Sequence, residues 1–233
     1  MYEKREIPAA SNRDHDNAEA SPELTTLLRT SARDLSPDDI AVNNLTCALG
    51  LPGAEGRSIP QYLRRLDDIV RVVRRETERE VAGFRRNRGR FRAFAGRSEA
   101  FYRAVSLVTI LKRKGYLRYN PDITDDERFC RIGYADSGDL LINGLLGDRR
   151  IGTCSNIPVL LVAVGRRLGY PLFVSANRHH VFARWDGIGP GSPPEGERFN
   201  IEASCAGVMG SKSDEEYRDF PSPMEPWEAE SGY

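Results

Sequence analysis

The segment Gly152-Thr-Cys-Ser-Asn-Ile-Pro-Val-Leu-Leu161 places a cysteine, Cys154, at the start of an apolar stretch. We expect a buried helix from Cys154 to Leu168, closed by Gly169, with Pro158 tolerated in its first turn. The unpaired N–H groups and partial positive charge at a helix N-terminus stabilise a thiolate, which is the reactive form of cysteine. Cys154 is therefore a candidate nucleophile, although a lone cysteine at a helix start also suits a purely structural role.

Three short strands are expected after this helix, over residues 171–176, 180–185 and 198–203, because apolar and polar residues alternate there. The adjacent pair His179 and His180 lies at the start of the second strand. Neighbouring side chains of a strand point to opposite faces, so only one of the two rings can face the cysteine helix. The pair equally suits a turn in which both rings are half exposed.

The third strand supplies a possible partner for the imidazole. Alternation puts Phe199 and Ile201 on one face and Asn200 and Glu202 on the other. A carboxylate or an amide there can accept a hydrogen bond from the histidine ring and fix its tautomer. The order of cysteine on a helix, histidine on a strand and a polar residue on the next strand is the papain-like order.

The first half of the chain is predicted to be mainly helical. Ser36 and Pro37 start one helix, the pair Ser58 and Gln61 forms a capping box for a second, and residues 98–114 form a third. We expect a mobile tail over residues 1–35, a helical region over 36–119 and an α+β core over 120–233. The part of this core beyond Cys205 is predicted to be irregular.

The overall composition points to no charged partner. Lys and Arg number 34, Asp and Glu number 34, and the formal net charge is zero, which gives no general attraction to nucleic acid or to an anionic membrane. The stretch Arg85–Arg103 is rich in arginine, and we interpret it as a solvated face rather than a phosphate-binding patch. Salt-dependent retention on DNA would support the opposite interpretation.

Cysteine spacing and hydropathy exclude further classes. The four cysteines, Cys47, Cys130, Cys154 and Cys205, form no CxxC pair and no zinc spacing, so we expect free thiols, no bound metal and no cofactor. No run of eighteen apolar residues occurs, and the N-terminal stretch has no apolar signal region. We therefore expect a cytoplasmic protein without a membrane partner.

Three segments together resemble the transglutaminase-like superfamily: residues 152–161, the strand from His180 to Trp185, and the strand Phe199–Ser204. The best match is the bacterial SirB-type branch, which has a helical N-terminal region. Further matching stretches cover most of residues 36–220 and are 44–45, 51–55, 62–67, 118–121, 139–140 and 144–147. The resemblance implies a papain- or transglutaminase-like core, with a helix packed on an antiparallel sheet, preceded by a helical region.

The resemblance also implies roles for individual residues. Cys154 takes the nucleophile position and His180 the histidine position, with His179 replacing the glycine that usually precedes it. Glu202 takes the place of the usual aspartate, and Asn200 remains a rival third member of the triad. Asn143 and Asn156 are candidates for a second oxyanion donor.

Two functions stay open at this point. One is a thiol acyl transfer or an amide or peptide hydrolysis through an acyl-thioester, with a protein or peptide substrate and with hydrolysis favoured over cross-linking. The other is an inactive module that binds a peptide or protein in the same cleft. The superfamily contains both active and inactive members, so the fold does not decide between them. The substrate, the acyl acceptor and the oligomeric state are not indicated by the sequence.

Overall fold

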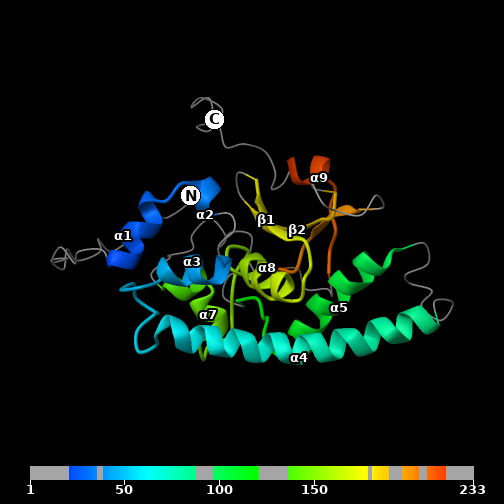
Figure 1. The fold of residues 1–233 in the computed structure, drawn as a ribbon, viewed down its shortest axis with the longest axis horizontal. Helices are drawn as coiled ribbons and strands as arrows, with labels where there is room; N and C mark the ends of the chain where they lie inside the picture. The colour runs from blue at the N-terminus through cyan, green and yellow to red at the C-terminus, as the bar shows by residue number, and fades with distance from the viewer. Residues whose placement is uncertain are drawn as a thin grey trace, which may run out of the picture.

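The computed structural model describes residues 21–35, 39–87, 97–120, 136–177, 180–188, 196–204 and 209–218. Within these residues the protein is α+β, with helices around a small antiparallel sheet (Figure 1). The helices are α1 (Pro22–Arg29), α2 (Ala32–Leu35), α3 (Ile40–Thr46), α4 (Ile59–Arg86), α5 (Glu99–Arg113), the 3₁₀ helix η4 (Ser137–Asp139), α7 (Asn143–Leu146), α8 (Ile157–Arg167) and α9 (Asp214–Arg218). The strands are β1 (Leu172–Ala176), β2 (Val181–Asp186) and β3 (Arg198–Ile201).

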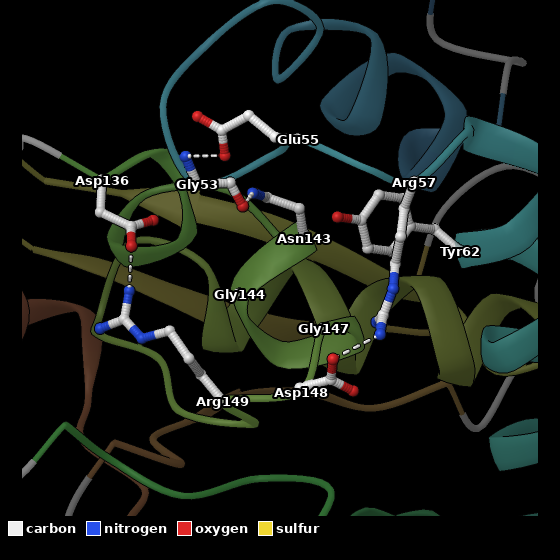
Figure 2. Close-up of a pocket in the computed structure, with 10 residues that line it drawn as sticks. All are labelled: Gly53, Glu55, Arg57, Tyr62, Asp136, Asn143, Gly144, Gly147, Asp148 and Arg149. Atoms are coloured by element: carbon white, nitrogen blue, oxygen red, sulfur yellow. Dashed lines mark hydrogen bonds and ion pairs between the residues drawn. The ribbon is translucent and has the colours of Figure 1, made fainter.

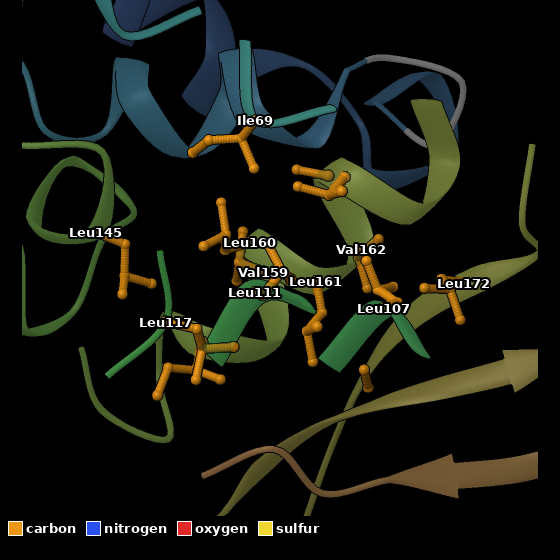
Figure 3. Close-up of a cluster of buried hydrophobic side chains, with 14 of the residues drawn as sticks. Ile69, Leu107, Leu111, Leu117, Leu145, Val159, Leu160, Leu161, Val162 and Leu172 are labelled. Atoms are coloured by element: carbon orange, nitrogen blue, oxygen red, sulfur yellow. The ribbon is translucent and has the colours of Figure 1, made fainter. Parts of the chain in front are cut away.

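Helix α8 is the centre of the molecule. Every residue from Ile157 to Gly165 is buried, as expected for a helix that is apolar on all sides. It packs against α3, α4 and α5 on one side and against β1 and β2 on the other. Figure 3 shows its side chains between Ile69 of α4, Leu107 of α5 and Leu172 of β1. At about 1.5–3 kcal/mol for each large side chain, this burial is the main source of stability.

The long helix α4 runs along one side of the molecule, and α5 lies against it (Figure 1). The α4 start is the capping box expected from Ser58 and Gln61. Ser98 caps α5 by accepting a hydrogen bond from the Phe101 N–H at 3.0 Å. One large hydrophobic cluster joins these helices to α8 and the sheet. A smaller cluster of Val81, Phe84 and Tyr102 lies between α4 and α5. The region expected to be helical and the expected α+β region therefore both contribute to the large cluster.

The sheet has the order β1-β2-β3, and both pairs are antiparallel, as the alternating segments predicted. Ala183 of β2 lies opposite Val174 of β1 and Ile201 of β3. Ala183 and Ile201 are buried in the core that also contains α8. Helix α9 lies over the opposite face of the sheet (Figure 1), where Tyr217 stacks on Phe182 with ring centroids 3.9 Å apart.

Two expectations about the chain ends are wrong in part. Residues 21–35 were expected to belong to a mobile tail, but α1 forms there because Ser21 caps it and Pro22 occupies its first position. Residues 1–20 lie outside the described residues. The C-terminal segment was expected to be irregular, but it contains α9, and Gly210 pairs with Glu202 through two backbone hydrogen bonds of 2.8 and 2.9 Å.

Among the described residues, the helices are all too short or too polar to cross a bilayer.

Candidate active site

Cys154 lies in a turn just before α8 rather than in its first turn, because the helix proper begins at Ile157. Its side chain is at the edge of the core, and the residue is 7% exposed. Its own backbone N–H donates to no group within the described residues. An N–H beside the sulfur that has no protein partner is available to an oxyanion formed on a substrate carbonyl.

Asn156 fixes the shape of this turn. Its Oδ1 accepts a hydrogen bond from the Thr153 N–H at 2.8 Å. Its Nδ2 donates to the carbonyls of Gly138 at 2.8 Å and Leu141 at 3.0 Å. A second tie runs from the Thr153 hydroxyl to the Asp139 carbonyl at 2.6 Å. The segment 138–141 therefore holds the turn that carries the sulfur.

His180 stands immediately before β2 and is also 7% exposed. Its N–H donates to Asn177 Oδ1 at 2.7 Å, and its carbonyl accepts from the Asn177 N–H at 2.9 Å. These two bonds close the connection between β1 and β2 and fix the backbone of the histidine. The ring Nε2 forms a short hydrogen bond with Glu202 Oε2. Because Nε2 is occupied by Glu202, Nδ1 is the ring nitrogen that remains for an interaction with Cys154.

Glu202, which is 8% exposed, follows β3 and shares the sheet face of His180. Its Oε1 accepts a hydrogen bond from the Ser204 N–H at 2.7 Å. Its Oε2 accepts from the Tyr217 hydroxyl at 3.2 Å in addition to the imidazole. Protein donors therefore bind both carboxylate oxygens, which sets the direction in which the carboxylate faces the ring.

The electrostatics of the group favour a charged histidine. Burial lowers the pKa of His180, but the hydrogen bond with Cys154 and the hydrogen bond and charge of Glu202 outweigh it and raise this pKa to about 9. Burial raises the pKa of Glu202, but the hydrogen bond and charge of His180 and the Ser204 N–H hold it below its ordinary value. At neutral pH the pair of His180 and Glu202 is therefore imidazolium and carboxylate.

Tyr217 of α9 completes the surroundings of the imidazole, and it was not predicted from the sequence. It is 2% exposed, and its ring lies nearly parallel to that of His180 with centroids 5.9 Å apart. Its carbonyl accepts a hydrogen bond from Asn177 Nδ2 at 2.5 Å. The signal that could have found this helix is Ser213-Asp-Glu-Glu216, a capping box in which the Ser213 and Glu216 side chains bind each other's N–H groups.

The other polar candidates are engaged elsewhere. Asn200 Oδ1 accepts from Arg184 Nε at 2.8 Å, and its Nδ2 donates to the Lys212 carbonyl and to Asp214, so the structure brings Glu202 and not Asn200 to the ring. As shown above, the Asn156 amide is bound to backbone carbonyls. Asn143 Nδ2 donates to the Gly53 carbonyl at 3.1 Å and to the Ser137 hydroxyl at 2.8 Å. Neither amide is placed as an oxyanion donor.

Several predicted features lie outside the described residues, namely His179, Cys130, Cys205 and positions 88–96 of the arginine-rich stretch. At the two ends of that stretch, Arg85 and Arg103 both bind Glu99. No cluster of three or more metal-ligating side chains occurs in the part of the chain that the structure describes.

Comparison of the chain with family models, with curated proteins and with solved structures finds no match. The resemblance to transglutaminase-like proteins therefore stays a prediction. The functional argument rests on the geometry of Cys154, His180 and Glu202 alone.

Proposed function

We propose that this protein is a cysteine-dependent acyl-transfer enzyme with Cys154 as the nucleophile and His180 as the general acid and base. Glu202 orients the imidazole and stabilises its protonated form. One observation carries the proposal: in a largely buried setting, Glu202 is hydrogen-bonded to the His180 ring, and Cys154 lies close enough to this ring to raise its pKa. An adjacent base that is oriented by a third group is the arrangement that activates a thiol.

The proposed reaction has two halves. The Cys154 thiolate attacks a carbonyl carbon, a C–S bond forms, and the carbonyl electron pair moves to an oxygen near the Cys154 N–H. Collapse of this intermediate breaks the bond to the leaving amine or alcohol, which takes the proton from the His180 imidazolium. Water then attacks the thioester while neutral His180 accepts its proton, and the returning pair expels the thiolate and releases a carboxylic acid.

We propose a protein or peptide amide as substrate and water as acyl acceptor. Water reaches a thioester without a dedicated binding site, whereas cross-linking needs a second site for an amine. The inactive alternative, a peptide-binding module, does not require an ion pair behind a cysteine. Keeping an imidazolium and a carboxylate buried is costly unless each is satisfied, and here both are bonded.

The first test measures thiol reactivity with iodoacetamide at pH 6.5, with the modified residue identified by mass spectrometry. We expect Cys154 to react faster than Cys47, whose pKa is raised by burial. Cys154→Ala should abolish the fast reaction, His180→Gln should slow it strongly, and Cys47→Ala should leave it unchanged. Equal rates at Cys47 and Cys154 would contradict an activated thiol.

A second test separates an enzyme from a binding module. An activated ester such as p-nitrophenyl acetate should acetylate Cys154 in one rapid burst, and the acetyl group should then be released by water. His180→Gln should slow both phases. A chain that binds peptides but is never acylated, although its Cys154 is alkylated, would support the inactive module.

A further inference from the structure

A separate pocket lies beside α7 and the start of α4 (Figure 2). Its volume is about 140 Å³. The segment before α4, the first turn of α4 and the loop around α7 supply its walls. Its charged residues are Glu55, Arg57, Asp136, Asp148 and Arg149, and Gly144 also lines it.

Tyr62 is the most informative residue of this pocket. Only 5% of the residue is exposed, yet its hydroxyl forms no hydrogen bond within the described residues. Figure 2 shows the hydroxyl oxygen pointing toward Asn143, into the space that these residues enclose. An unpaired hydroxyl can both donate and accept a hydrogen bond. The hydroxyl is therefore placed for a partner that enters the pocket.

Two ion pairs flank this space and give each side both signs of charge (Figure 2). Arg57 binds Asp148 at 2.6 Å, and Arg149 binds Asp136 at 2.5 Å. A guanidinium has five N–H donors, and Arg57 uses one of them for this bond, so further donors remain for a ligand. Glu55 adds a third carboxylate, of which one oxygen accepts from the Gly53 N–H at 2.7 Å.

The mixed charges select the type of ligand. A simple anion is attracted by the guanidinium groups but repelled by the three carboxylates. A simple cation is attracted by the carboxylates but repelled by the guanidinium groups. A molecule that carries both a positive and a negative charge can place each charged end near a protein group of opposite charge. The volume is close to the roughly 150 Å³ of a protein cavity that holds benzene, so the ligand has about six non-hydrogen atoms.

Glycines keep the space open. A Cβ on Gly53 would lie 2.0 Å from Asp136 Oδ1, and Gly53 has a φ of +87°, which other residues rarely adopt. A Cβ on Gly147 would lie 2.7 Å from the Asn143 carbonyl oxygen. Side chains at these two positions would displace the groups that form the pocket.

We propose that this pocket binds a small zwitterion, a free α-amino acid of about the size of alanine. Its ammonium group binds the Tyr62 hydroxyl and the carboxylate of Glu55, and its carboxylate binds the spare N–H groups of Arg57. The site is independent of the proposed catalytic function, and no amino acid substrate or product is implied by it.

The test is a titration of the ¹⁵N-labelled full chain, followed through the backbone amide resonances of Gly53, Gly144 and Gly147. Three probes are compared at constant ionic strength: alanine, isobutyrate, in which a methyl group replaces the ammonium, and isopropylamine, in which a methyl group replaces the carboxylate. We expect saturable shifts with alanine and binding at least about tenfold weaker for each of the others. No saturable shift with alanine, or equal affinity for a singly charged probe, would overturn the proposal.

Variants then locate the contacts. Tyr62→Phe removes only the hydroxyl and should weaken alanine binding by about fivefold or more. Glu55→Gln removes one exposed charge and should also weaken it, whereas Glu78→Gln on the exposed face of α4 should not. The same spectra report whether each variant is folded. Unchanged alanine affinity in folded Glu55→Gln and Tyr62→Phe would refute the assigned contacts and the proposal with them.

Discussion

The third residue of the candidate triad is a glutamate, and its surroundings explain how the longer side chain is controlled. A glutamate has one more rotatable bond than an aspartate and loses more conformational freedom when it is fixed. Here Ser204 and Tyr217 each contribute one hydrogen bond to Glu202 in addition to His180. The added donors hold a flexible side chain in the position that the imidazole requires.

Replacing Glu202 by glutamine tests its charge separately from its shape. Glutamine can still accept one hydrogen bond, but it no longer stabilises the imidazolium, so the pKa of His180 should fall. We expect the rate of ester hydrolysis to drop on the order of a hundredfold or more, as for other orienting carboxylates. Glu215→Gln, an exposed change on α9, is the control and should leave the rate unchanged. Equal rates in both variants would exclude a catalytic contribution from Glu202.

Tyr217→Phe makes a finer change at the same carboxylate. Phenylalanine keeps the stacking on Phe182 but removes one donor from Glu202, which becomes the stronger base. The pKa of His180, about 9 in the parent chain, should rise by roughly half a unit. The basic limb of the pH–rate profile for ester hydrolysis should therefore move to higher pH. A uniform rate loss with an unmoved limb would mean that Tyr217 is only structural.

For single residues, the sequence predicts the position of a side chain well where local backbone geometry determines that position. The period of two in a strand put Glu202 on the face where it meets His180, and the helix start directed attention to Cys154. The sequence does not predict contacts between segments that are far apart along the chain. Nothing near Asn156 in the sequence indicates that its amide binds the Gly138 and Leu141 carbonyls. The contact of Tyr217 with Glu202 depends likewise on how α9 folds back over the sheet.

Among the elements, those with strong caps and a clear apolar period were predictable. The capping box of α4 and the Ser98 cap of α5 stand where their sequences predict them. Short helices were missed, because α1 and α9 bury few or no apolar side chains and depend on their caps. The same caps, Ser21 and Ser213, are visible in the sequence once a short helix is considered.

Two glycines on neighbouring elements should respond to alanine in opposite ways. Gly83 lies in α4 with nothing within 4 Å of an added Cβ, so Gly83→Ala should stabilise the chain by about 0.5–1 kcal/mol. A Cβ on Gly144 in α7 would lie 2.0 Å from the Gly138 carbonyl oxygen, and backbone cannot easily move away. Gly144→Ala should destabilise by about 1–3 kcal/mol. Urea denaturation measures both, and a stabilising Gly144→Ala would contradict the packing of α7 against η4.

At the level of the whole molecule, the buried ion pair makes stability depend on pH in a defined direction. The folded pKa of His180 lies near 9, above its ordinary 6.5, so its contribution is complete below pH 6.5 and is lost as pH rises through 9. The pKa of Glu202 lies below its ordinary 4.5, so its contribution is present above pH 4.5 and is lost in more acidic solution. Together they stabilise the fold most between about pH 4.5 and 6.5.

A comparison of the parent chain with His180→Gln tests this pH dependence. The parent chain should exceed the variant in free energy of unfolding by a constant amount between pH 5 and 6.5. This excess should shrink by roughly 3 kcal/mol between pH 6.5 and 9.5. The pKa of His180 is about 9 in the folded chain and 6.5 in the unfolded chain, and each pH unit between these values corresponds to about 1.4 kcal/mol. Urea denaturation at pH 5.5, 7.5 and 9.5 measures it. An excess that stayed constant or grew toward pH 9.5 would mean that the histidine is neutral in the folded chain. The step that protonates the leaving group in the proposed reaction would then have no donor.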